Sequence, residues 1–208
     1  MIIKAGIEMS YASKIGIYQG DCKVLSGKHQ MFSCYIEEFA KTINTGDHGL
    51  DLGTGPSGCN AKFFTLAKLD GCDVEIEVID SLSSIDYMKT FLYVLGKDTL
   101  PYGDETLDFV VCSCVIQHLN SFHELEMGIS DISRVLKPSG SFYLMFKVGT
   151  NNTILTHHNE YYNEERSFRV FSLKSIIDLA SASFKLISHE YLLDENHIAY
   201  CCTIFQKL

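Results

Sequence analysis

The residues with the clearest chemical use lie in positions 49–58, where an apolar strand ending, Gly-Leu-Asp-Leu, runs into the glycine-rich turn Gly-Thr-Gly-Pro-Ser-Gly. Gly53, Gly55 and Gly58 follow a G-x-G-x-x-G spacing, with Thr54 inside the turn. Glycines at this spacing let the backbone turn sharply and approach a ligand with no Cβ in the way. The segment therefore predicts a binding site for a nucleoside-like cofactor at the end of a strand.

Two neighbouring residues bear on which cofactor that is. Asp51 stands two residues before the first glycine, where we expect its carboxylate to point toward the ligand and to repel a pyrophosphate. Pro56 removes one of the N–H donors that a phosphate-binding turn would use. S-adenosylmethionine carries a sulfonium and an ammonium and no phosphate, so both residues favour it over NAD. Because dinucleotide-binding folds share the glycine pattern, an NAD-dependent oxidoreductase stays the alternative.

The elements that would position this turn alternate between strand and helix. Strands are predicted at residues 50–53, 74–80, 91–95, 107–116 and 141–147, and helices at 57–71 and 125–136. The segment 107–116 is almost continuously apolar, which is typical of a parallel strand covered on both faces. A helix capped by Ser172 and two strands at 185–193 and 198–206 complete the chain as a hairpin. The order predicts an α/β, Rossmann-like, doubly wound sheet, mostly parallel, with an antiparallel C-terminal hairpin.

The length of 208 residues predicts a single domain. Residues 1–47 are expected to form one or two covering helices or a lid, with Tyr11 and Tyr18 as lid candidates, residues 48–148 the cofactor-binding core, and residues 149–208 a polar substrate loop followed by the hairpin.

Composition restricts the possible partners. Seventeen Lys and Arg against 26 Asp and Glu give a net charge of -9, which disfavours unaided binding to nucleic acid. The first residues are too quickly polar for a secretory signal, and no apolar run is long enough to span a bilayer, so a soluble cytoplasmic protein is expected. The eight cysteines form no C-x-x-C pair, and we interpret them as small buried apolar residues in a reducing compartment, with no metal site.

Three motifs in order resemble the class I S-adenosylmethionine-dependent methyltransferases over about residues 48–148. They are Asp-Leu-Gly-Thr-Gly at 51–55, Leu-Asp-Phe-Val through Val-Ile-Gln-His-Leu at 107–119, and Ile-Ser-Arg-Val-Leu-Lys-Pro-Ser-Gly at 132–140. The resemblance implies a seven-stranded sheet whose last two strands form a reversed hairpin at the edge. The chain departs from the family pattern at Gln117, where the family usually has histidine, and at Ser139, where it usually has glycine.

The resemblance also implies roles for single residues. Asp51, Gly53 and Gly55 would surround the methionine end of the cofactor, and Asp80, at the end of the second predicted strand, would accept hydrogen bonds from both ribose hydroxyls. Asp98 would accept from the adenine amino group, or else cap its own loop. The implied cofactor-binding set is Asp51, Gly53, Thr54, Gly55, Asp80, Ser81, Asp98, Cys112 and Ser113, the last two lining the cleft near the transferable methyl group.

The methyl acceptor is less defined than the cofactor. His118, just past the fourth strand, is the candidate general base, with helix-start packing as its alternative role. The loop 149–167 is the candidate for acceptor recognition through four residues, His157, His158, Tyr161 and Tyr162. A small-molecule acceptor fits the short chain best. A tRNA or protein methyltransferase that works with a partner subunit, or a catalytically degenerate cofactor-binding subunit, are the alternatives.

Overall fold

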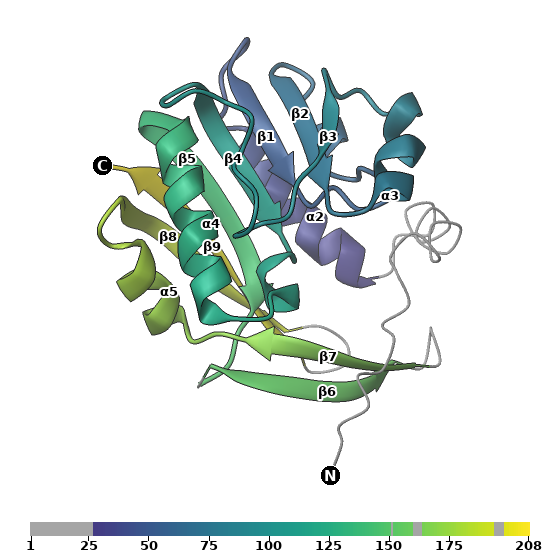
Figure 1. The fold of residues 1–208 in the computed structure, drawn as a ribbon, viewed down its shortest axis with the longest axis vertical. Helices are drawn as coiled ribbons and strands as arrows, with labels where there is room; N and C mark the ends of the chain where they lie inside the picture. Colours follow the sequence, from purple (N-terminus) through teal and green to yellow (C-terminus); the bar gives the residue numbers. More distant parts are fainter. Residues whose placement is uncertain (1–26, 151, 160–163, 194–197) are drawn as a thin grey trace.

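A seven-stranded sheet with the order β3-β2-β1-β4-β5-β9-β8 forms the centre of the computed structural model (Figure 1). The structure describes residues 27–150, 152–159, 164–193 and 198–208. The strands are β1 (His48–Leu52), β2 (Lys68–Asp73), β3 (Thr90–Leu92), β4 (Leu107–Ser113), β5 (Leu136–Lys147), β8 (Phe184–Leu193) and β9 (Ala199–Lys207). The first five strands are parallel, and β9 runs antiparallel between β5 and β8. This confirms the predicted doubly wound sheet with an antiparallel C-terminal hairpin.

Alternating side chains of the central strands enter two separate apolar layers. Val110 and Cys112 of β4 pack toward α4 (Phe122–Val135) and α5 (Leu173–Ala180), whereas Phe109 and Val111 pack toward α2 (Gly27–Ala40). Burial on both faces explains why the sequence of β4 is almost continuously apolar. The two C-terminal helices begin at serines whose hydroxyls accept backbone N–H bonds, as predicted for Ser172.

The second strand and the helix before it differ from the prediction. Residues 68–73 form β2, whereas the predicted strand at 74–80 is mostly the short helix α3 (Ile76–Ser81). Asp70 was expected near the end of the helix predicted at 57–71, but it lies buried within β2. His48 Nε2 and the Tyr102 hydroxyl each lie 2.7 Å from its carboxylate. Those contacts offset the cost of burying a charge in a strand.

The helix predicted at 57–71 is replaced by turns and one short 3-10 helix, η2 (Ala61–Phe63). Between the end of β1 and the start of β2 the chain folds tightly over the sheet, and Ala61 and Phe64 provide the apolar contacts. The third strand, β3, also starts earlier and is shorter than the predicted segment 91–95.

The polar loop predicted at 149–167 contains a two-stranded hairpin, β6 (Thr153–Asn159) and β7 (Glu164–Val170). Figure 1 shows this hairpin below the main sheet, beyond the end of β5. A bridge between Val148 and Phe171 joins it to the chain that leaves β5. The sequence obscured the hairpin because its strands are rich in polar residues and it is not part of the main sheet.

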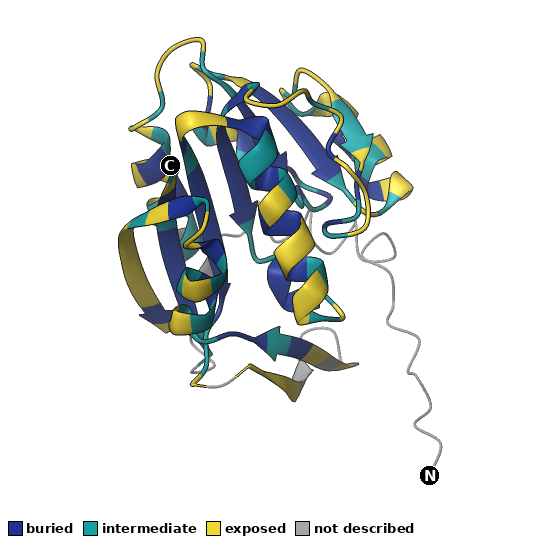
Figure 2. Cartoon of the chain, turned by 60° about the vertical axis from the view of Figure 1, so that its left-hand side comes forward, coloured by how far each residue is buried: buried dark blue, intermediate teal, exposed yellow. Residues whose placement is uncertain are grey.

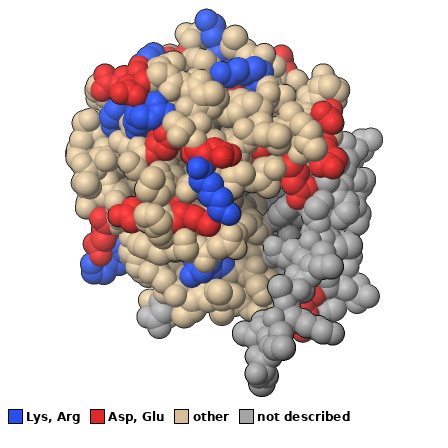
Figure 3. Space-filling view, in the orientation of Figure 1, with Lys and Arg blue, Asp and Glu red and all other residues tan. Residues whose placement is uncertain are grey.

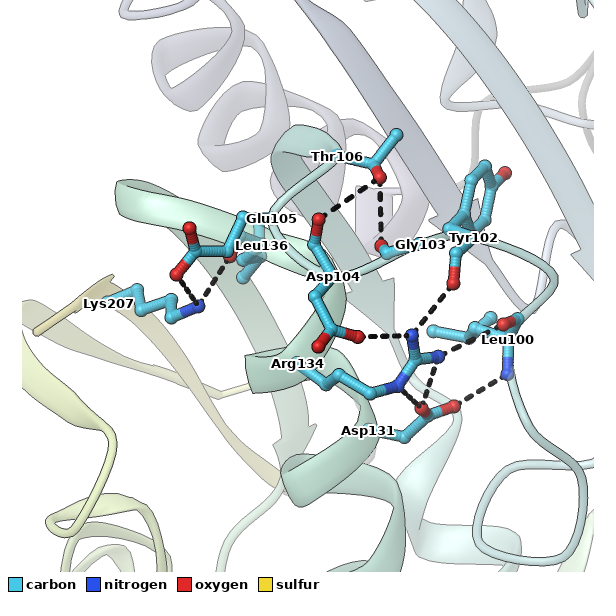
Figure 4. Close-up of polar contacts among 10 residues, drawn as sticks. All are labelled: Leu100, Tyr102, Gly103, Asp104, Glu105, Thr106, Asp131, Arg134, Leu136 and Lys207. Atoms are coloured by element: carbon cyan, nitrogen blue, oxygen red, sulfur yellow. Dashed lines mark hydrogen bonds and ion pairs between the residues drawn. The ribbon is translucent and has the colours of Figure 1, made fainter.

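The motif residue Arg134 has a structural role (Figure 4). Its guanidinium donates to the backbone carbonyls of Tyr102 and Leu100, at 2.7 and 3.0 Å, and pairs with Asp131 on the preceding turn of α4. Asp131 in turn accepts a 2.7 Å bond from the Leu100 N–H. Arg134 and Asp131 therefore hold the loop before β4 against α4.

The cysteines follow the expectation in part. Cys72, Cys112, Cys201 and Cys202 are free and buried, as expected of small apolar residues. Cys34 is free but exposed, and Cys59 is disulfide-bonded, so the interpretation of all eight as reduced core residues is wrong at these two positions.

No helix in the described part of the chain is long and apolar enough to cross a membrane. Tyr11 and Tyr18, the lid candidates, lie outside the described residues.

Candidate functional site

The glycine turn after β1 is held against the end of β2. Gly53 N–H and Thr54 N–H both donate to the Cys72 carbonyl, at 2.8 and 3.1 Å, and Gly55 N–H donates to the Asp73 carboxylate at 3.0 Å. Gly53 and Gly55 have φ values of +77° and +60°, in the region that favours glycine. The turn therefore joins the carboxyl ends of two adjacent parallel strands, which is where open α/β sheets bind ligands.

The two glycines face different surroundings. A Cβ at position 53 would lie 2.2 Å from Cγ2 of Val115, so Gly53 is needed for close contact with the segment that follows β4. A Cβ at position 55 would have no atom of the described residues within 4 Å. Gly53 thus packs against protein, and Gly55 borders open space in which a ligand can approach the backbone.

Asp51 is oriented differently from the prediction. Its side chain is fully buried, accepting a 2.6 Å bond from the Tyr87 hydroxyl and a 2.9 Å bond from the Asn60 amide. Burial raises its pKa to about 6, although the two hydrogen bonds act in the opposite direction. The expectation of a carboxylate exposed to the ligand is wrong, because the side chain is buried against Asn60 and Tyr87. With a pKa of about 6 it carries its charge at neutral pH.

Asp73, which the sequence analysis missed, is the acidic residue at the end of β2. Its carboxylate accepts from Gly55 N–H and from Val74 N–H, and burial raises its pKa. Asp80 was predicted to be the acid at the end of the second strand. It lies instead on α3 and is exposed, so the prediction that it ends a strand is wrong. The error follows from the wrong position of the predicted second strand: a strand at 74–80 ends at Asp80, whereas the observed β2 ends at Asp73.

Ser81, also on α3, lies beside the turn. Its hydroxyl bonds to the Pro56 carbonyl at 3.0 Å and to the Val78 carbonyl at 2.6 Å, and so ties α3 to the glycine turn. The Thr54 hydroxyl oxygen, in contrast, is buried and has no hydrogen-bond partner within the part of the chain that the structure describes. An unpaired buried hydroxyl in a turn that borders open space suits a polar group supplied by a ligand.

The other predicted cofactor residues divide into two groups. Asp98 accepts a 2.8 Å bond from Val94 N–H, which matches its alternative role as a loop cap. Cys112 is completely buried in the apolar layer under α4, so its side chain does not line a cleft, and burial raises its pKa. Ser113, at the end of β4, is partly exposed, and its role at the cofactor site stays a prediction.

The segment after β4 carries the candidate base. Cys114 has φ +60°, an uncommon conformation for a residue with a side chain, and the short helix η4 (Ile116–His118) follows it. The His118 ring packs edge-on against the Phe168 ring of β7, with centroids 5.3 Å apart. Gln117 is buried, and none of the described residues forms a hydrogen bond with its side-chain oxygen.

The predicted acceptor residues fall on the hairpin. His157 pairs in register with Arg166 and His158 with Glu165 across β6 and β7. Tyr161 and Tyr162 lie outside the described residues. A residue that the sequence analysis missed, Lys147, is almost fully buried at the end of β5, where the hairpin begins. The sequence feature that could have indicated Lys147 is its position directly after the apolar run at 142–146.

Comparison with known proteins identifies the domain. Residues 50–144 match the family described as "Methyltransferase domain". The chain is 24% identical over 169 residues to the ubiquinone/menaquinone biosynthesis C-methyltransferase UbiE of Teredinibacter turnerae, an alignment that covers 76% of this chain. It spans 65% of that relative's length, just under two thirds.

Solved structures share the fold. A SAM-dependent methyltransferase from Methanosarcina mazei superposes with a TM-score of 0.70 at 17% identity, covering 82% of this chain and 97% of that one. The N-methyltransferase NodS from Bradyrhizobium japonicum, solved with S-adenosyl-L-homocysteine, gives 0.69 at 9% identity, covering 96% and 99%. At these identities the likeness concerns the fold alone. The domain match over residues 50–144 and the shared fold support a class I S-adenosylmethionine-dependent methyltransferase.

Proposed function

We propose that this protein transfers a methyl group from S-adenosylmethionine to a small-molecule acceptor. The observation that carries the proposal is the arrangement at the carboxyl ends of β1 and β2, where Gly55 borders open space and the Asp73 carboxylate lies within hydrogen-bond distance of its N–H. When bound there, the cofactor would supply a methyl group on a positively charged sulfur, which a nucleophile can displace.

The chain's own residues fit this cofactor in three ways. Asp73 would hold the ribose hydroxyls, because a carboxylate offers two acceptor oxygens at a strand end. The unpaired Thr54 hydroxyl would bond to a polar group of the ligand. The buried Asp51 charge would favour a cationic ligand over a pyrophosphate.

The acceptor is inferred to be a small molecule. The curated relative is named for methylation at carbon in ubiquinone and menaquinone biosynthesis, which supports an acceptor of that size. On the face drawn in Figure 3, the described basic side chains lie beside acidic ones and form no continuous basic surface. A tRNA acceptor would therefore require a partner subunit to contact the phosphates. His118 is proposed as the base for an acceptor that must lose a proton.

The ribose assignment is tested by exchanging two nearby acids. Asp73→Asn is expected to weaken S-adenosylmethionine binding by about 10-fold or more, because a charge-assisted hydrogen bond is lost. Asp80→Asn, an exposed change on the adjacent helix, is expected to leave the affinity unchanged. Titration calorimetry gives the affinities, and thermal melting of both variants separates a binding defect from unfolding. Weaker binding by Asp80→Asn with unchanged binding by Asp73→Asn would instead assign the ribose contact to Asp80.

Turnover tests the activity itself. The purified protein is incubated with S-adenosylmethionine labelled in its methyl group and with separate metabolite, peptide and tRNA pools. Transfer of label to the metabolite pool is expected. Saturable cofactor binding with no formation of S-adenosylhomocysteine in any pool would indicate a cofactor-binding subunit instead of an enzyme.

A further inference from the structure

The side chain of Gln117, in η4 just after β4, has a buried oxygen without a partner. The residue is 5% exposed, and no described residue forms a hydrogen bond with its Oε1. Among the described residues, the only other buried side-chain oxygen in this state is Oγ1 of Thr54 in the glycine turn. An unpaired buried oxygen costs free energy, and most such atoms in folded proteins have a partner. Both oxygens are therefore candidates for a hydrogen bond from a ligand.

The two unpaired oxygens lie on segments that meet at one edge of the sheet. Thr54 follows β1 and Gln117 follows β4, and these two strands are parallel neighbours. The segments after them are in contact, because a Cβ at Gly53 would lie 2.2 Å from Cγ2 of Val115. Open α/β sheets bind ligands at the carboxyl ends of their strands. Gln117 therefore belongs to the ligand-binding edge of the sheet, just beyond the contact with the glycine turn.

The segment that contains Gln117 is also fixed to the β6–β7 hairpin. Arg169 of β7 donates to the Leu119 carbonyl at 3.3 Å and to the Asn120 carbonyl at 2.6 Å. Residues 115–120 thus contact the glycine turn at one end and the hairpin at the other. Because the hairpin carries residues predicted to recognise the acceptor, Gln117 lies on the stretch that joins the proposed cofactor site to the predicted acceptor site.

The chemistry of an amide oxygen limits the group that can pair with it. A carbonyl oxygen only accepts hydrogen bonds, and the amide does not titrate, so this property is the same at every pH. An ammonium, an amine or a hydroxyl fits this oxygen, whereas a carboxylate or a phosphate dianion has no proton to donate. The related family usually has histidine at this position, so the resemblance does not supply this contact.

We propose that Gln117 is a ligand-binding residue of the methyl-transfer site and that its Oε1 accepts a hydrogen bond from an N–H or O–H group. Two molecules of the reaction offer such a group: S-adenosylmethionine through its ammonium, and the methyl acceptor through an amine or a hydroxyl. This inference rests on the proposed function and adds a residue to its site. An acceptor held in this way presents a neutral or cationic donor to Gln117, and no anionic group.

The cofactor is tested first, with S-adenosylhomocysteine and a desamino analogue in which hydrogen replaces the ammonium. Titration calorimetry on the full-length protein measures both affinities. If the ammonium is the donor, wild type should bind S-adenosylhomocysteine about 10-fold more tightly than the analogue. Gln117→Leu should weaken S-adenosylhomocysteine binding by about the same factor and leave the affinity for the analogue unchanged. Gln117→Glu, which keeps an acceptor oxygen, should retain the preference.

The methyl acceptor is tested second, on the complex with S-adenosylhomocysteine. Phenol is the probe because it has one neutral hydroxyl, and fluorobenzene, of similar size, has no donor. If the acceptor supplies the donor, wild type should bind phenol about 5-fold more tightly than fluorobenzene. Gln117→Leu should remove this preference without changing the affinity for S-adenosylhomocysteine.

Thermal melting of the free protein separates ligand binding from a structural role. Gln117→Leu removes an unpaired oxygen, so the free variant should melt at the wild-type temperature or above it. Gln206→Leu is the matched control, because this exposed glutamine on β9 donates to the Ser139 carbonyl at 3.4 Å and its loss should leave every ligand affinity unchanged. If Gln117→Leu fails to fold, Gln117→Met takes its place in both titrations.

The proposal is overturned if wild type shows neither preference, or if Gln117→Leu or Gln117→Met keeps both at full strength. Equal losses of affinity for a ligand and its donor-free analogue, together with a lower melting temperature, would indicate a structural role and also overturn it. Failure of wild type to bind S-adenosylhomocysteine would overturn the proposed function together with this inference. Absence of label transfer in the pools, with a preference that depends on Gln117, would count against turnover alone and support the binding role.

Discussion

At the scale of single residues, two glycines share a backbone requirement and open surroundings but differ in place. Gly46 and Gly55 both have positive φ, and among the described residues no atom lies within 4 Å of a Cβ built at either position. They differ in place, because Gly46 lies before β1 and Gly55 lies at the proposed cofactor site. Substituting each of the two glycines therefore distinguishes the effect of backbone strain on stability from the effect of a side chain on ligand binding.

Gly46→Ala and Gly55→Ala are each expected to lower the free energy of unfolding by about 1–2 kcal/mol, because alanine is strained in the left-handed region. Only Gly55→Ala is expected to weaken S-adenosylmethionine binding, since its methyl group would occupy space proposed for the cofactor. Urea denaturation measures the first effect and calorimetry the second. Equal affinities of the two variants would place the cofactor elsewhere.

Asp51 predicts a pH dependence of cofactor binding. Its raised pKa of about 6 means that the folded protein carries this negative charge above about pH 6 and loses it below. Affinity for S-adenosylmethionine should therefore fall several-fold between pH 7 and pH 5. Asp51→Asn should bind more weakly at pH 7 and show a flatter profile. A wild-type affinity that rises toward pH 5 would contradict a role for this charge.

The same residue affects stability with a definite sign. The pKa of Asp51 is near 4 in the unfolded chain and higher in the folded one, so the folded protein binds this proton more tightly between about pH 4 and pH 6. The contribution of Asp51 to the free energy of unfolding therefore decreases as the pH rises through this window. The charge is retained at a cost in stability, as expected for a group with a binding role.

At the scale of elements, the family-like motifs serve two different purposes. The segment 51–55 forms the ligand turn, whereas Asp108 and Lys137, from the second and third motifs, form a 2.7 Å ion pair that also involves the His48 backbone N–H. That interaction lowers the pKa of Asp108 in spite of its partial burial. The residues of the second and third motifs thus stabilise the assembly of the sheet, and only the first motif forms the ligand turn.

The Arg134 cluster gives a stability prediction for the loop before β4. Arg134→Met should lower the free energy of unfolding by about 2–3 kcal/mol, because two backbone carbonyls and Asp131 lose a charged donor. Lys174→Met, which removes an exposed ion pair on α5, should change it by about 0.5 kcal/mol or less. Urea denaturation at a constant m-value measures both. Similar small effects would mean that solvent replaces the Arg134 bonds.

At the scale of the whole molecule, burial is concentrated in the central strands and decreases toward the hairpin (Figure 2). β4 and residues 142–147 of β5 are almost entirely buried, whereas described residues of β6 such as Ile154 and Leu155 are more than half exposed. The proposed cofactor and acceptor sites lie where these regions meet. The rigid sheet would position the cofactor while the hairpin, with fewer contacts, adapts to the acceptor.

Hydrogen exchange followed by mass spectrometry checks this distribution. Amides of β4 and β5 should exchange slowest and those of β6 fastest among the described strands. Adding S-adenosylhomocysteine should slow exchange in residues 53–60 and at the end of β2, and leave the edge strand β8 unchanged. Protection confined to β8 would place the ligand on the wrong side of the sheet.

The sequence by itself determined the class of sheet, the glycine turn, the helix capped by Ser172 and the C-terminal antiparallel hairpin, because each depends on local signals: apolar periodicity, glycine spacing and a serine cap. Only the tertiary structure decided which acid ends β2, because Asp70 can occupy a buried strand position only with distant partners, His48 and Tyr102. The same holds for Asp51, whose burial depends on Asn60 and Tyr87, and for Lys147, whose aromatic neighbours come from two later strands. A charged residue can stand anywhere in a sequence, but the free energy of burying its side chain depends on hydrogen-bond and ion-pair partners that only the fold brings together.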